Sequence, residues 1–187
     1  MDFKKLNEEI ENLLMDINEL YPKDAGEEIT NFESYEQALD IIKKRYDENK
    51  SLAYCPNALK FDYNGNKYQL AVVLGIKEPN NGMNPHGLAH ILDKHSYQYD
   101  GVPTEEDLIK AARNVKTVLN KSLKTGNYLF NPEDNKLIFG NSKFIYIICL
   151  AKDDDELTYL HTLFMTDKKD YLKRHKKRLN KKFRKGY

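Results

Sequence analysis

Hydrophobic positions recur every three or four residues in several parts of the chain, which is the spacing of an amphipathic helix. This pattern predicts helices over residues 3–20, 34–48 and 105–122. Thr104 and Asp107 stand three residues apart at the start of the third helix, and such a pair can form a capping box. The outer faces of the first two helices are acidic, so we expect these faces to be solvated.

Shorter apolar runs bounded by turn residues predict strands. We expect strands over residues 58–64, 67–76, 127–131, 136–140, 143–151 and 157–166. Asn64 and Gly65 separate the first two runs, and Asn-Gly is a strong signal for a hairpin turn. The run 143–151 is strongly apolar and should be the best-buried strand. A short helix is predicted over 86–95, after a loop rich in Asn, Gly and Pro.

The order of these elements predicts an α+β fold in which helices precede a helix and an antiparallel sheet. We expect an acidic helical accessory region over 1–50, an α+β core over 51–167 and a basic C-terminal helix over 168–187. The two N-terminal helices form either a small subdomain or the first layer of the main core.

Charge is distributed very unevenly along the chain. Residues 168–187 contain eleven Lys or Arg and one acid, Asp170, so the rest holds 19 basic and 28 acidic residues. A helix with this charge predicts phosphate contacts along RNA. The residues that we expect to make them are Lys173, Arg174, Lys176, Lys177 and Arg178. Two alternatives remain open: packing on the acidic helices of the same chain, and binding to an anionic membrane, which the sparse apolar stripe and the lack of Trp disfavour.

The cell compartment expected from the sequence is the cytoplasm. Cys55, expected in a loop, and Cys149, expected in a strand, give no disulfide framework, although a single bridge between them stays open. No apolar stretch approaches the roughly 20 residues that span a bilayer, and the first residues do not resemble a signal sequence.

Three of the five histidines fall within ten residues, at His86, His90 and His95. His86 and His90 are four residues apart and could hold zinc. A zincin helix would need Glu after the first His, where this chain has Gly87, so we expect neither metal nor cofactor. Histidines that merely complete a helix are a second interpretation.

Metal-independent cleavage of RNA is a third interpretation. The 2′-OH of RNA is an internal nucleophile, so an enzyme need only move protons and stabilise charge on the phosphate. Histidine suits both proton transfers because its ordinary pKa lies near 6.5.

The run from Gly87 to His95 resembles the His-Ile-x-x-basic-His signature of phage-associated members of the barnase–EndoU–colicin–RelE-like (BECR-fold) nuclease superfamily. The resemblance extends over roughly residues 67–167 and ends in a strand with Thr before an aromatic residue. It implies His90 and His95 as catalytic histidines and Thr162 as the hydroxyl on the last strand.

Two lysines complete the residues that the resemblance implies. Lys94 matches the basic residue before the second histidine and is expected to contact RNA, and Lys143 is expected to stabilise the phosphate. Lys136 and Lys152 flank nearby strands and are alternatives to Lys143. His161 should face away from Thr162, because side chains alternate along a strand, and we therefore leave it outside the site.

The function expected from the resemblance is an endoribonuclease of phage or toxin type that leaves a 2′,3′-cyclic phosphate. The alternative is a non-catalytic phage-encoded protein on the same fold, which binds RNA or a host ribonucleoprotein and inhibits host defence.

Overall fold

The structure, a computed structural model, describes residues 25–80, 83–96, 103–154 and 156–165. These residues form the helices α2 (Tyr35–Asp47), α3 (Gly87–His95), α4 (Glu105–Arg113) and α5 (Val115–Thr125). The predicted capping box is present at the start of α4, where Thr104 and Asp107 each bond the other's backbone N–H. The helices predicted over 3–20 and 168–187 lie outside the described residues.

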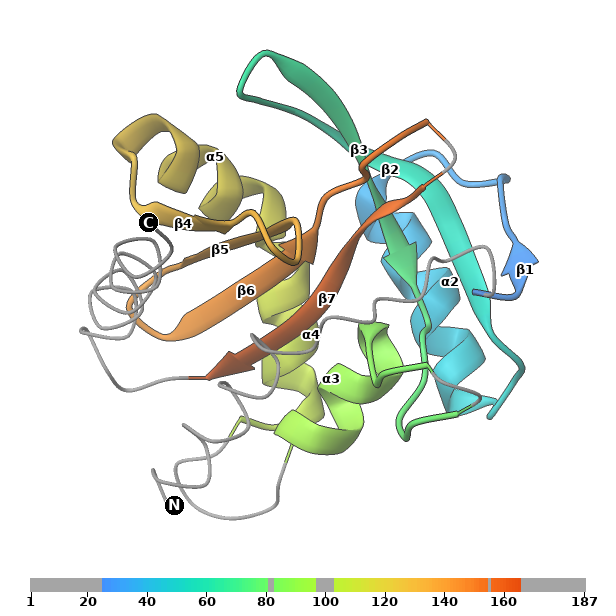
Figure 1. Cartoon of the computed structure of the whole chain (residues 1–187). Helices are drawn as coiled ribbons and strands as arrows, with labels where there is room; N and C mark the ends of the chain where they lie inside the picture. The colour runs from blue at the N-terminus through green and yellow to red at the C-terminus, as the bar shows by residue number, and fades with distance from the viewer. Residues whose placement is uncertain (1–24, 81–82, 97–102, 155, 166–187) are drawn as a thin grey trace.

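Seven strands of this part of the chain form one sheet (Figure 1). They are β1 (Glu27–Glu28), β2 (Ala53–Tyr63), β3 (Asn66–Val73), β4 (Tyr128–Asn131), β5 (Lys136–Gly140), β6 (Phe144–Cys149) and β7 (Thr158–Met165). Their order across the sheet is β1-β2-β3-β7-β6-β5-β4. The predicted antiparallel meander is present from β4 to β7, but β1 pairs with β2 and β3 with β7 in parallel. The fold is therefore α+β with a mixed sheet.

The hairpin of β2 and β3 turns at Asn64 and Gly65, which have φ angles of 49° and 81°, as the Asn-Gly signal predicts. β2 begins earlier than predicted, so Cys55 lies in a strand and not in a loop. The pairing of β2 with β3 shifts register between Cys55 and Leu59. Pro56 lies in this irregular stretch. Proline has no N–H, but none is needed there for pairing with β3, so the strand can contain it.

One face of the sheet packs against helices and contains most of the core (Figure 1). α2 contributes Ala38, Leu39 and Ile42 to the same hydrophobic cluster as Leu119 of α5 and Tyr146 of β6. α2 thus belongs to the layer that covers the sheet, although the sequence places it in an accessory region that ends at residue 50.

The helix predicted over 105–122 is divided at Asn114 into α4 and α5. The hydroxyls of Tyr35 and Tyr146 donate to the carbonyls of Ala112 and Ala111, at 2.9 and 3.0 Å. Asn114 has φ −87° and ψ 3°, and its N–H bonds back to the same two carbonyls. Tyr35 of α2 and Tyr146 of β6 thus bind the carbonyls at the end of α4.

Both cysteines are buried free thiols. None of the helices in the described ranges is long and apolar enough to cross a membrane.

Candidate functional site

The histidine helix α3 lies where two parallel strands separate. β3 and β7 pair only at Leu70 with Thr158 and at Ala71 with Tyr159. Beyond these pairs the strands diverge, and α3 packs against both of them, mainly against β7 (Figure 1). Leu88, Ile91 and Leu92 point into the main core, so the other side of α3 is left to its histidines.

Close backbone contacts set the start of α3 against the end of β3. Ile76 and His86 exchange two backbone hydrogen bonds of 3.1 and 3.2 Å, and Ala89 N–H donates to the Leu74 carbonyl at 2.8 Å. A Cβ atom at Gly75 would lie 1.9 Å from the His86 carbonyl oxygen, and the φ angle of Gly75 is +65°. Only glycine fits such a position, so this contact sets where the histidine helix begins.

His90 and His95 converge. Their ring centroids are 5.2 Å apart and their planes are nearly perpendicular. His95 Nε2 lies 3.2 Å from Thr162 Oγ1 on β7, a hydrogen bond between buried groups. Within the part of the chain that the structure describes, neither ring nitrogen of His90 has a hydrogen-bond partner, although both atoms are buried. The structure therefore brings together the two histidines and the hydroxyl that the resemblance implies.

His161 lies on the same face of the sheet as Thr162, and the alternation expected from the sequence is wrong at this point. Thr162 pairs with Ile147 and Leu160 with Ile148, so His161 is an extra residue in β7. Leu160 and Leu163 both belong to the main core although they are three residues apart. A bulge of this kind opposes two residues to one and breaks the alternation. It leaves His161 and Thr162 together on the face away from that core.

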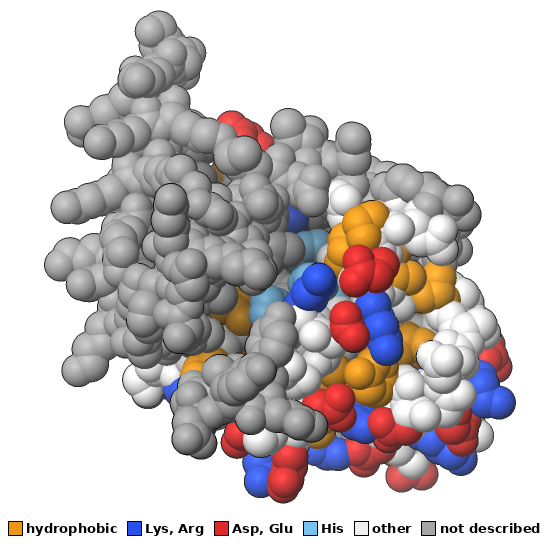
Figure 2. All heavy atoms as spheres, turned by 90° about the horizontal axis from the view of Figure 1, so that it is seen from below, with side chains coloured by type: hydrophobic (Ala, Val, Ile, Leu, Met, Phe, Trp, Pro, Cys, Tyr) orange, Lys and Arg blue, Asp and Glu red, His pale blue; other side chains and the backbone are white. Residues whose placement is uncertain are grey.

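His86, His90, His95 and His161 form what we call the histidine cluster, and all four are at most 8% exposed. His86 is the N-cap residue of α3, and its Nδ1–H donates to the Asn84 carbonyl at 2.8 Å. Figure 2 shows histidine side chains, in pale blue, beside lysine or arginine and carboxylate side chains.

Burial governs the charge of these rings. Burial, assisted by His86 and Lys94, lowers the pKa of His90 to about 4. Burial, assisted by His90 and Lys94, lowers the pKa of His95 to about 3. The pKa of His161 is also lowered, first by burial and then by Lys136, His86 and His90. His90, His95 and His161 are therefore uncharged near neutral pH in the free protein.

The predicted lysines are distributed differently from the expectation. Lys94 forms a 3.8 Å ion pair with Glu78 and acts electrostatically on His90 and His95. Lys143 is exposed, with its Nζ over the ring of Phe144, whose side chain faces the main core. The structure does not bring it to the cluster.

Lys136 is the lysine of the sheet that does act on the cluster. It is fully buried, pairs with Cys149 and lowers the pKa of His161. The sequence places it beside a strand but cannot show which face of the sheet it occupies. The expected RNA contacts at Lys173, Arg174, Lys176, Lys177 and Arg178 lie outside the described residues.

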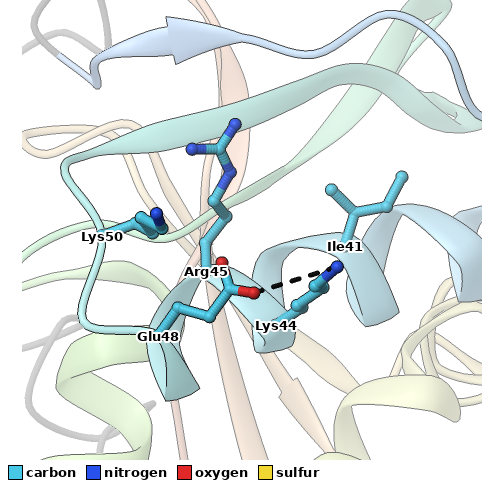
Figure 3. Close-up of a pocket in the computed structure, with 5 residues that line it drawn as sticks. All are labelled: Ile41, Lys44, Arg45, Glu48 and Lys50. Atoms are coloured by element: carbon cyan, nitrogen blue, oxygen red, sulfur yellow. Dashed lines mark ion pairs between the residues drawn. The ribbon is translucent and has the colours of Figure 1, made fainter.

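The described residues contain no group of three or more His, Cys, Asp or Glu side chains arranged to hold a metal ion. They do form a surface hollow of about 410 Å³ at the end of α2, lined by Ile41, Lys44, Arg45, Glu48 and Lys50 (Figure 3). Lys44 pairs with Glu48 at 3.8 Å, and Arg45 pairs with Glu27. Its charges are thus largely paired, and it contains no histidine.

No protein-family model matches the sequence, and neither the curated proteins nor the solved structures contain a match. Function is therefore inferred from the chemistry of the histidine cluster.

Proposed function

We propose that this protein is a metal-independent endoribonuclease. The observation that carries the proposal is the convergence of His90 and His95, with ring centroids 5.2 Å apart, next to the Thr162 hydroxyl 3.2 Å from His95 Nε2. Two imidazoles can carry out both proton transfers in the transesterification of RNA, in which the substrate supplies the nucleophile.

The two imidazoles have different roles in the proposed reaction. The 2′-oxygen forms a bond to phosphorus as its proton passes to one neutral imidazole. The bond from phosphorus to the 5′-oxygen breaks, and the other histidine, as imidazolium, gives that oxygen a proton. His90 and His95 share these two roles, one as the base and the other as the acid. The products are a 2′,3′-cyclic phosphate and a 5′-hydroxyl.

Binding of an anion promotes the protonation that the reaction requires. Both histidines are neutral near pH 7 in the free protein, but a phosphodiester beside them favours the protonated imidazole. The site therefore takes up a proton from the solvent as the substrate binds. Thr162 orients His95 through the hydrogen bond between them.

The burial of the cluster favours the second candidate, a protein that binds RNA or a ribonucleoprotein without cleaving it. His90 is 6% exposed and His95 8% exposed, so a phosphodiester reaches their nitrogens only if the surroundings move. Under this alternative the rings are buried structural groups and no proton transfer occurs.

Cleavage of RNA in EDTA distinguishes the two candidates. The full chain is incubated with total RNA and with a short oligonucleotide whose cleavage ends are analysed by mass spectrometry. We expect 2′,3′-cyclic phosphate ends, and at least a hundredfold slower cleavage by His90→Ala and by His95→Ala, since each removes one proton transfer.

Ser122→Ala is the matched control, because Ser122 is buried on α5 and α5 packs on the other face of the sheet. It should cleave at the wild-type rate. Intact RNA after incubation with the folded wild-type protein, or equal cleavage by the histidine variants, would reject the enzyme and leave the binding protein.

A further inference from the structure

The bulge in β7 adds His161 to the buried cluster that His86, His90 and His95 form. His161 is 3% exposed, and its buried Nδ1 has no hydrogen-bond partner among the described residues. A polar nitrogen left in this state costs free energy, and native proteins rarely keep one without a function. His90 shares this property at both of its ring nitrogens.

Three groups from two elements act electrostatically on His161, and each is cationic or becomes so on protonation. They are Lys136 of β5, His86 at the N-cap of α3 and His90 within α3, and after burial itself all three lower the pKa of His161. The Tyr159 ring lies 6.2 Å from it on β7. Bases that converge in a buried place oppose one another's protonation, and an anion among them would remove that opposition.

We propose that His161 is a further phosphate-binding residue of the histidine cluster, whose ring takes up a proton and donates from Nδ1 to a non-bridging oxygen of the scissile phosphodiester. This rests on the proposed function, since it assigns the phosphate of that reaction a place between α3 and β7. His90 contributes to the same anion, and Thr162 stays with His95. Two adjacent residues of β7 thus serve the site, because the bulge turns both toward it.

The first test uses inorganic phosphate and the full wild-type chain with ¹⁵N-labelled histidine. We expect phosphate to move the ring nitrogens of His161 and His90 from the neutral to the imidazolium chemical shifts at pH 7. Calorimetry in two buffers of different ionisation enthalpy should show net proton uptake. Phosphate that does not bind, or that binds while His161 stays neutral, would overturn the proposal.

The second test uses His161→Phe, which keeps an aromatic ring and removes both nitrogens. Its affinity for phosphate should fall at least tenfold, and its urea midpoint should not fall, because a nitrogen without a partner contributes no hydrogen bond to the folded state. Ser122→Ala should bind phosphate as the wild type does. An unchanged affinity in His161→Phe would contradict the proposal, as would a purely structural result in which the urea midpoint falls and phosphate still binds.

The outcomes separate this proposal from the enzyme itself. If phosphate protonates His161 but RNA is not cleaved, the anion site stands and the nuclease does not. If RNA is cleaved and His161→Phe alters neither phosphate binding nor cleavage, the nuclease stands without this residue. The wild-type titration decides the matter if His161→Phe does not fold.

Discussion

His90 and His95 are both buried, but they differ in hydrogen bonding. His95 has a partner in Thr162 at 3.2 Å, whereas His90 has none for either nitrogen. The same substitution should therefore have different effects at the two positions.

We expect His90→Leu to raise the free energy of unfolding at pH 7 by about 1 kcal/mol, because it replaces two unpaired nitrogens with apolar surface. His95→Leu should be neutral or destabilising by about 1 kcal/mol, because it leaves the buried Thr162 hydroxyl without that bond. Urea unfolding of both variants checks the contrast. A loss of stability in His90→Leu would show that its ring has a partner in solution.

The gain in stability that we expect from His90→Leu should depend on pH. His90 titrates at about 4 when folded and at about 6.5 when unfolded. Between these values the unfolded chain binds one more proton at this position, so His90 by itself lowers wild-type stability by about 1.4 kcal/mol per unit as pH falls. His90→Leu lacks this loss, so its advantage over the wild type should grow between about pH 6.5 and about pH 4.

Catalysis should depend on pH in the opposite sense. With histidine pKa values of about 4 and about 3 in the free protein, only a small fraction carries one proton near pH 7. We expect kcat/KM to fall about tenfold per unit between about pH 5 and about pH 7, because it reports the free enzyme. The fall in kcat should begin at higher pH, since bound phosphate raises both pKa values. A flat kcat/KM over this range would contradict the assignment of these histidines.

At the scale of elements, the position of α3 depends on one close approach and not on the helix sequence alone. Gly75 and Gly126 have almost the same φ angle, +65° and +66°, but of the two only Gly75 lies against backbone atoms. This pair separates conformational strain from steric contact.

Gly126→Ala should cost about 1 kcal/mol, the ordinary penalty for a left-handed alanine. Gly75→Ala should cost at least about 3 kcal/mol, because its Cβ would meet the His86 carbonyl oxygen and displace the start of α3. Urea unfolding measures both variants. Equal costs would mean that β3 and α3 can separate without loss.

At the scale of the whole molecule, charge is segregated toward residues 168–187, which lie outside the described residues. Replacing Lys173, Arg174, Lys176, Lys177 and Arg178 with Gln should weaken binding of single-stranded RNA regardless of sequence. The slope of log K against log salt should shrink by up to about 3.5, at roughly 0.7 for each phosphate that is no longer neutralised. Gln at Lys116, Lys121 and Lys124, exposed on α5, is the control and should leave the slope unchanged. An unaltered slope in the first variant would exclude this segment from RNA binding.

Local patterns in the sequence determined the class of fold and most of the elements. The apolar stripe of α2, the Asn64-Gly65 turn, the Thr104 capping box and the histidine helix each depend on residues within a few positions of one another, so they can be predicted without tertiary contacts. The convergence of His90 with His95 does not belong to this group, because five residues along a helix rotate the side chain by about 140°. The resemblance implied both histidines, and only the structure shows their rings 5.2 Å apart.

Tertiary structure alone decided which residues meet in the histidine cluster. The parallel pairing of β3 with β7, the break at Asn114 and the face occupied by Lys136 rest on contacts between segments far apart in the chain. His161 is the clearest case: a strand pattern places it away from Thr162, and a single extra residue in the register with β6 turns it toward His90. Register is a property of two strands together, and neither strand's sequence contains it.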